Sequence, residues 1–423
     1  MAKRKIDFLS VLRKIKNNKL SSKLSSHYDG VLEKKGIDPK DPSAKNAKRA
    51  TFAGVTLIIV CMMFLLLMFV IFGNGISPVK VYDFFREVNA MGEIGEGERE
   101  EISYSLPTRN QSFSEFKRGF IVASDREISV FNKAGYATMS EQMTYSNPQI
   151  VTSDETFLVY DLGGRGFTLF NSFEDIYIES REYPISAAAM ATDGRFAISA
   201  SSAIYNTEVV FYDESGESLF AYMRSDYTVD MKYSPSGKYL ALVTLDASEG
   251  EYIYTLTVLS TKNGKVVSHV TRSGRLPYSC YFMEGDRIAL ICSDAVIVYN
   301  SKCEKVDDYE YPSGQLYRVD ASKEFIALMF IKDKVNMNST VRILDSKGEE
   351  QVDFEMYGEY SDMVISSRYV YFASEDGVYR LNIHSPKLQF FELNATNGRI
   401  LILDGSRVML CRPNMAYIID SWS

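Results

Sequence analysis

The chain has 423 residues, of which 46% are hydrophobic and 24% are charged, and its net charge is −8 at pH 7. The charge is uneven, because residues 1–49 hold 14 Lys and Arg against 5 Asp and Glu, residues 50–73 hold none, and the rest is strongly acidic. An acidic domain excludes a nucleic-acid-binding function, which depends on neutralising phosphates. The three histidines are far apart in the sequence (His27, His269 and His384), so a histidine-based metal site or catalytic triad is disfavoured.

The first predicted element is a short basic amphipathic helix near the N-terminus. Phe8, Val11, Leu12 and Ile15 fall at helical spacing among lysines and arginines. Two interpretations stay open: a helix that lies on an anionic inner leaflet, or a helix that only supplies positive charge for membrane orientation. The remainder of residues 1–49 has the composition of a flexible cytoplasmic tail.

An apolar stretch without a charged residue runs from 51 to 72. As a helix it would be about 33 Å long, enough to cross a hydrocarbon core of roughly 30 Å. We therefore predict one transmembrane helix within residues 50–73. It is too long and too far from the N-terminus for a cleaved signal peptide, so we expect a signal-anchor. The basic run KNAKR precedes it, and the positive-inside rule then predicts a cytoplasmic N-terminus and an extracytoplasmic C-terminal domain.

Residues 74–101 are predicted to form a juxtamembrane linker, and residues 102–423 a repeat domain. The domain consists of short β-rich runs separated by turns, with no long helical period. Its clearest units are SPSGKYLALVTLD, ATDGRFAISASS and MEGDRIALICSD, each followed by a second β-rich run. One apolar residue marks the buried second strand of each unit: Phe120, Phe157, Phe196, Tyr239, Ile288, Ile326, Val370 and Val408. Their spacing of 37 to 49 residues is typical of a propeller blade.

The eight markers predict an all-β propeller of about eight four-stranded blades, with seven blades as the alternative because the last unit is short. That unit ends in AYIIDSW and lacks one strand. The segment EEISYSLPT at residues 100–108 would supply the missing strand if the two ends of the domain pair with each other. Such closure leaves few exposed sheet edges.

The segments SPSGKYLAL and ATDGRFAIS resemble the turn-plus-strand signature of WD-repeat-like propellers. The whole layout of basic tail, single anchor and divergent propeller resembles an uncharacterised family of single-pass membrane proteins from clostridia-type bacteria. The resemblance implies a propeller on the outer side of the cell membrane, and it implies no chemistry.

Known propeller enzymes are poorly matched. Quinone-dependent propeller dehydrogenases carry a Trp motif in almost every blade, whereas Trp422 is the single tryptophan of this chain. The outer domain contains no G-x-S-x-G nucleophile elbow. The GGRG segment at residues 163–166 lies between two strand patterns, so we expect a tight hairpin there and not a phosphate-binding loop. No cofactor or metal is expected.

Four cysteines follow the predicted span, at Cys280, Cys292, Cys303 and Cys411, without the spacing of a zinc site. Cys280 and Cys292 occupy apolar runs, where a free thiol behaves as a small hydrophobic residue. We expect unpaired core cysteines, with a Cys280–Cys292 disulfide as the alternative.

Loop lengths indicate a candidate binding site. The loops between the second and third strands of all blades lie on one face of a propeller, and they look long in three units: SSAIYNTE, DASEGEYIY and KDKVNMNS. Insertions on one face of a repeat protein often bind partners. We therefore predict a partner-binding site around these residues: Tyr205, Glu249, Tyr252, Lys334 and Asn336.

The predicted function is that of a membrane-anchored binding or scaffolding module for a protein or a cell-envelope ligand, with no catalysis evident. The alternative is an envelope hydrolase or lyase with a carboxylate-lined site in the channel of the propeller.

Overall fold

The structure is a computed structural model that describes residues 60, 62–64, 101–104, 110–132, 135–312, 315–333, 338–393, 398–404, 407–419 and 422. The chain divides into two compact units, residues 1–93 and 94–423. In the first unit, residues 60 and 62–64 are helical. Among the residues described, no helix is long and apolar enough to cross a membrane. The predicted tail, the predicted linker up to residue 100 and most of the predicted span lie outside the described residues, and Glu101, the last residue of that linker, belongs to a strand.

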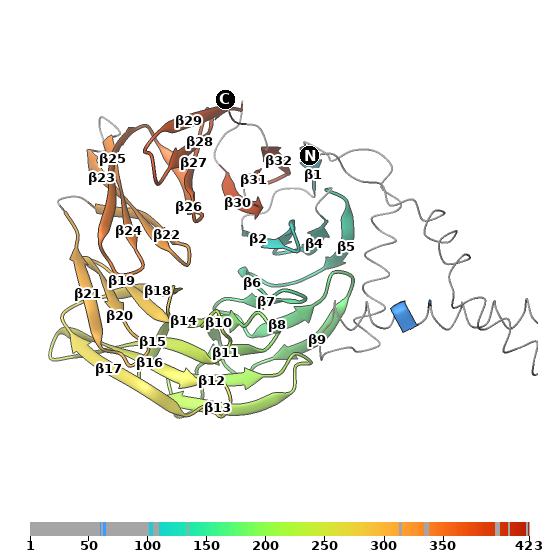
Figure 1. The fold of residues 1–423 in the computed structure, drawn as a ribbon. Coiled ribbons are helices and arrows are strands. Elements are labelled where there is room, and N and C mark those ends of the chain that lie inside the picture. The colour runs from blue at the N-terminus through green and yellow to red at the C-terminus, as the bar shows by residue number, and fades with distance from the viewer. Residues whose placement is uncertain are drawn as a thin grey trace, which may run out of the picture. The chain divides into compact units, whose positions relative to one another are not determined.

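The second unit is a ring of four-stranded antiparallel sheets, the blades of a propeller (Figure 1). The first four blades, from the innermost strand outward, are as follows. Blade 1 holds β2 (Gln111–Phe116), β3 (Gly119–Ser124), β4 (Glu127–Phe131) and β5 (Ala137–Gln142). Blade 2 holds β6 (Pro148–Thr152), β7 (Phe157–Asp161), β8 (Gly166–Phe170) and β9 (Asp175–Ser180). Blade 3 holds β10 (Ile185–Met190), β11 (Phe196–Ala200), β12 (Thr207–Tyr212) and β13 (Ser218–Arg224). Blade 4 holds β14 (Tyr227–Tyr233), β15 (Tyr239–Ser248), β16 (Glu251–Ser260) and β17 (Val266–Ser273).

The other four blades continue around the ring. Blade 5 holds β18 (Pro277–Met283), β19 (Arg287–Cys292), β20 (Ala295–Tyr299) and β21 (Lys305–Glu310). Blade 6 holds β22 (Gln315–Ala321), β23 (Phe325–Asp333), β24 (Asn338–Asp345) and β25 (Glu350–Tyr357). Blade 7 holds β26 (Tyr360–Ile365), β27 (Tyr369–Ser374), β28 (Gly377–Asn382) and β29 (Leu388–Glu392). Blade 8 holds β30 (Arg399–Asp404), β31 (Arg407–Cys411), β32 (Met415–Ile419) and, outermost, β1 (Glu101–Ser103).

The prediction of eight four-stranded blades is confirmed, and each predicted marker lies on the second strand of its blade. Neighbouring blades cover both faces of the middle strands, so these strands are continuous apolar runs; every residue of β3, β7 and β11 is buried. The outermost strands face solvent on one side and alternate, as β13 does. Two-sided burial is therefore the physical origin of the repeat.

Stacked aromatic pairs join the second and third strands of the first three blades. In each pair the two rings are opposite one another in the register, with centroids 4.6, 5.2 and 4.7 Å apart: Phe120–Phe131, Phe157–Phe170 and Phe196–Tyr212. Such cross-strand pairs contribute about 0.5–1.5 kcal/mol beyond their buried area. They explain why phenylalanine recurs at the marker positions of these blades.

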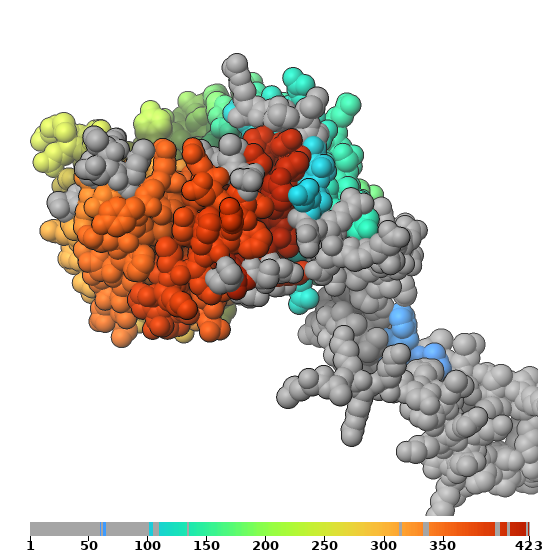
Figure 2. Space-filling model, turned by 90° about the horizontal axis from the view of Figure 1, so that it is seen from above, coloured from blue at the N-terminus to red at the C-terminus, as the bar shows by residue number. Residues whose placement is uncertain are grey.

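The ring closes through its two ends, as predicted from residues 100–108. Three residues of β1 pair with β32, placing Ile102 opposite Ala416 with 1% of its surface exposed. The Tyr104 hydroxyl donates a hydrogen bond to the Met415 carbonyl at 2.9 Å. In Figure 2 the cyan start of the propeller lies directly against the red C-terminal strands.

Each face of the ring carries its own kind of connection. The loops between second and third strands and the links between blades share one face, here called the loop face. The turns between first and second strands and between third and fourth strands share the other, here called the turn face. Because β1 runs antiparallel to β32, it begins at the turn face and ends at the loop face. The chain therefore enters the propeller from the turn face.

Carboxylates on three innermost strands bind backbone amides of the next blade. Asp230 accepts a hydrogen bond from the Cys280 amide at 3.0 Å. Asp320 accepts one from the Ile365 amide at 2.8 Å, and Asp362 accepts one from the Ile400 amide at 2.8 Å. Burial raises the pKa of Asp320 to about 6, and the hydrogen bond from the Ile365 amide partly opposes the rise. These hydrogen bonds link each of the three blades to the next one.

The Asp320→Asn variant should be more stable than the wild type at pH 7, because an amide oxygen still accepts the Ile365 hydrogen bond while the buried charge is gone. The folded pKa of Asp320 lies above the unfolded value of 3.8, so its contribution to stability is full below about pH 4 and falls as pH rises to about 6. The expected difference is on the order of 2–3 kcal/mol. Denaturant unfolding of both proteins between pH 4 and 7 measures it, and parallel stability profiles would contradict it.

Asp362→Asn is the matched control. Asp362 accepts a hydrogen bond from the Ile400 amide and is also ion-paired with Arg399 at 3.2 Å. Removing its charge leaves Arg399 without that partner, so this variant should be slightly less stable than the wild type at pH 7. The two Asp→Asn changes are therefore expected to have opposite signs.

Two smaller predictions are also confirmed. The four described cysteines are free and buried, and burial raises the pKa of the Cys292 thiol to about 12. The alternative Cys280–Cys292 disulfide is therefore wrong. Residues 162–165 connect β7 and β8 as a tight hairpin in which Gly163 has a φ of +80°, and Gly166 is the first residue of β8.

Candidate functional site

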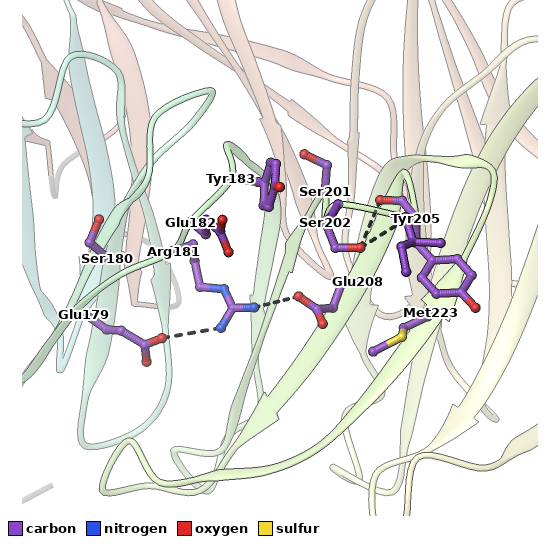
Figure 3. A pocket seen from close by; sticks show the side chains of 12 residues that line it. Glu179, Ser180, Arg181, Glu182, Tyr183, Ser201, Ser202, Tyr205, Glu208 and Met223 are labelled. Atoms are coloured by element: carbon purple, nitrogen blue, oxygen red, sulfur yellow. Dashed lines mark hydrogen bonds and ion pairs between the residues drawn. The ribbon is translucent and has the colours of Figure 1, made fainter.

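A groove of about 430 Å³ opens on the loop face between blades 2 and 3. Its walls are the end of β9 with the link to β10, the loop between β11 and β12, and the nearby parts of β12 and β13. Figure 3 shows its charged side chains in one group, and Tyr205 and Met223 beside them. The groove is therefore built where two blades meet.

The loop between β11 and β12 presents an apolar side chain at the rim of this groove. The Ser202 amide donates a hydrogen bond to the Tyr205 carbonyl at 2.8 Å, and the Tyr205 amide donates one to the Ser202 hydroxyl at 3.1 Å. These bonds close a tight turn with Ile204 near its tip, and 84% of the Ile204 surface is exposed. Turn positions usually hold polar residues, so an isoleucine here is unexpected for stability alone.

A three-residue ionic network forms the floor of the groove. Arg181 Nη2 lies 2.8 Å from Glu208 Oε2, and its Nη1 lies 3.4 Å from Glu179 Oε1. The Tyr177 hydroxyl donates to the second oxygen of Glu179 at 2.7 Å. Burial alone would lower the pKa of Arg181, but Tyr212, Glu208 and Glu179 more than offset it, so the pKa is raised and the guanidinium stays charged.

The groove combines apolar and charged side chains. An exposed isoleucine, a tyrosine and a methionine stand beside carboxylates whose positions are held by Arg181. Apolar contact area beside a few oriented polar groups is typical of binding sites. In the described part of the chain, no group of three or more His, Cys, Asp or Glu side chains is arranged to hold a metal ion.

Among the predicted binding residues that the structure describes, Tyr205 alone lines the groove. Glu249 and Tyr252 do not line it, and the long loop predicted for the fourth unit is wrong. β15 and β16 continue to Ser248 and Glu251, joined by Glu249 and Gly250 with φ values of +54° and +84°. Positive φ at both central residues is the geometry of a two-residue hairpin turn, so Tyr252 is a half-exposed strand residue.

Lys334 and Asn336 lie outside the described residues. Ile331 and Ser339, on either side of that segment, line a second cavity of about 370 Å³ together with Tyr317. This cavity also belongs to the loop face, at blades 6 and 7.

Sequence reasoning missed most of the groove. Arg181 and Glu208 come from a link between blades and from a third strand, and their pairing depends on how two blades pack. Met223 lies on an outermost strand, which the loop-length argument does not consider. Ile204 had a usable signal, because it is a large apolar residue within the polar run SSAIYNTE.

Solved structures resemble the chain at low sequence identity. BamB from Moraxella catarrhalis superposes with a TM-score of 0.52 and 10% identity, covering 77% of this chain and 99% of that one. The Neurospora crassa Pan2 WD40 domain gives 0.45 and 11%, over 75% and 89% of the two chains, and Kuenenia stuttgartiensis hydrazine synthase gives 0.48 and 12%, over 66% and 97%. The likeness to BamB shows the propeller fold.

No curated protein matches the chain. Residues 98–419, which include every strand of the propeller, match the family of unknown function DUF5711. The match covers well over half of the chain, and the chain therefore belongs to that family.

Proposed function

We propose that the chain is a membrane-anchored, extracytoplasmic propeller that binds a protein partner through the groove between blades 2 and 3. The observation that carries the proposal is Ile204, held at the tip of a hydrogen-bonded turn with 84% of its surface exposed beside that groove. Met223 and Tyr205 extend the apolar contact surface, with 46% and 37% exposed. Exposed apolar residues that cluster at a cavity are typical of interaction sites.

The charges of the groove suggest the character of the partner. Glu179, Glu182 and Glu208 surround the single cation Arg181, so the lining carries a net negative charge. A partner segment with one apolar side chain next to a Lys or Arg would complement both parts of the groove. Complementary charges increase the association rate and favour the correct partner.

The membrane anchor and the outer location rest on the sequence. The predicted span precedes β1, and β1 begins at the turn face, so the chain does not enter the propeller on the face that holds the groove. A C-terminal epitope tag should be labelled by a membrane-impermeant reagent in cells with an opened wall, while an N-terminal tag stays protected. Protection of both tags would show that the orientation is wrong.

Partner capture with two charge-introducing variants tests the groove. The full-length chain, its Ile204→Asp and its Met223→Asp variants are cross-linked in cells, and the captured proteins are quantified. Each variant should lose the groove partner at least tenfold, because it replaces apolar contact area with a carboxylate that faces the apolar side chain of the partner. Val266→Asp is the matched control, since Val266 lies on the outermost strand of blade 4 with 45% of its surface exposed. Equal capture by all four proteins would overturn the proposal.

A further inference from the structure

A third cavity, unrelated to the groove, opens at the centre of the turn face. It has a volume of about 390 Å³ and is lined by residues from four consecutive blades, at the ends of β10, β14, β18 and β22. It is here called the central recess. Its volume lies within the roughly 300–1,000 Å³ of ligand pockets.

Three aromatic side chains converge on the central recess from different packing clusters. Tyr233 packs on the core between blades 3 and 4, Phe282 on the core between blades 4 and 5, and Tyr281 on the core between blades 5 and 6. All three are half-buried and line the recess. One part of each side chain is therefore fixed by the core, while another part stays available to a ligand.

Polar groups stand beside these rings. Lys232 lines the recess with 42% of its side chain exposed, and its Nζ lies 3.3 Å from Asp230 Oδ1. Asp230 is held in place because its other oxygen accepts a hydrogen bond from the Cys280 amide. Burial alone would lower the pKa of Lys232, but Asp230 more than offsets it, so the ammonium stays protonated and able to donate.

The rim adds groups that are free to turn toward a ligand. Lys323 and Thr192 are exposed, and Ser322 also lines the recess on the side of blade 6. The backbone at Lys323 is fixed, because its carbonyl accepts a hydrogen bond from the Glu284 amide at 2.7 Å. Among the described residues, none is ion-paired with Lys323.

We propose that the central recess binds a sugar ring of a glycan. A pyranose has apolar C–H faces, which pack on aromatic rings, and a girdle of hydroxyl groups, which need donors and acceptors at the edge of those rings. The apolar faces of the sugar would pack on the three aromatic rings, which are Tyr233, Tyr281 and Phe282. Its hydroxyl groups would bond to the polar side chains beside them, which are Lys232, Lys323 and Thr192. Lys232 is paired with Asp230, which does not itself line the recess, so the excess charge of the recess is the single ammonium of Lys323. One ammonium that donates to hydroxyl groups suits an uncharged sugar better than a polyanionic one.

Calorimetric titration of the full-length chain tests the proposal with three trisaccharides: N-acetylglucosamine trimer, maltotriose and trigalacturonic acid. The chain is kept in a polyoxyethylene detergent, because a glycosidic detergent would compete. At least one uncharged trisaccharide should bind saturably, and Phe282→Ala and Lys323→Ala should each weaken that binding at least tenfold. Lys323 is exposed, so its variant keeps the test valid even if Phe282→Ala fails to fold.

Tyr278→Ala is the matched control. Tyr278 belongs to the same strand as Phe282, lies at the opposite end near the loop face, and is 54% exposed. This variant should bind with wild-type affinity. Absence of saturable binding by both uncharged trisaccharides, or binding that survives Lys323→Ala and Phe282→Ala, would overturn the proposal. Neither result bears on the groove between blades 2 and 3, whose test uses other residues.

Discussion

The Ile102→Asp variant should lose about 4 kcal/mol of unfolding free energy, a large fraction of the stability of a typical domain. Ile102 is 1% exposed and packs with Phe120, Met409 and Ala416, which belong to the first and the last blade. The change removes this apolar contact and buries a carboxylate among apolar neighbours. Because β1 is only three residues long, no other residue of the strand replaces that contact.

Denaturant unfolding of the full-length chain measures this effect, with far-UV circular dichroism for the sheets and the fluorescence of the single tryptophan for the last blade. Val266→Asp introduces the same charge on an exposed strand and should change stability by no more than about 0.5 kcal/mol. Ile102→Val should lie between the two, at about 0.5–1.5 kcal/mol. If the denaturant midpoint of Ile102→Asp equals that of Val266→Asp, the pairing of β1 with β32 does not stabilise the closed ring.

Closure of this kind was predictable because it follows from counting strands. Seven complete units and an eighth that ends one strand short leave an unpaired edge on β32, and the first β-rich run of the domain is the segment available to cover it. The blade count was predictable for a related reason. Burial on both sides makes each second strand a short apolar run, and Phe157 and Val370 mark their runs equally clearly.

The binding surface was much less accessible to the same reasoning. Loop length is a poor measure of exposure, since the polar run DASEGEYIY turned out to pair residue by residue as a long hairpin. The ion pair of Arg181 with Glu208 joins segments 27 residues apart across a blade boundary. No local pattern encodes such a contact, because it depends on the twist and spacing of whole blades. The central recess was missed for the same reason, as its residues come from four repeats.

A second large effect on stability is expected near the C-terminus, where Trp422 packs against blade 7. The Arg380 guanidinium lies 4.4 Å from the ring centroids of both Tyr369 and Trp422, and its Nη2 donates to Gln389 Oε1 at 2.6 Å. Arg380 is 8% exposed, so this cation–π contact is largely shielded from water. Trp422→Ala should therefore cost about 3 kcal/mol of unfolding free energy.

A double-mutant cycle separates the cation–π contact from simple loss of packing. Arg380→Met and Trp422→Ala should be coupled by about 1–2 kcal/mol, measured by denaturant unfolding with circular dichroism because Trp422→Ala removes the fluorescent residue. Arg368 supplies the matched cycle: its guanidinium lies 5.3 Å from the Tyr369 ring. Arg368→Met combined with Trp422→Ala should be additive within about 0.5 kcal/mol. Equal coupling energies in the two cycles would mean that Trp422 stabilises its contact with blade 7 through buried area alone. The cation–π contact with Arg380 would then contribute nothing specific.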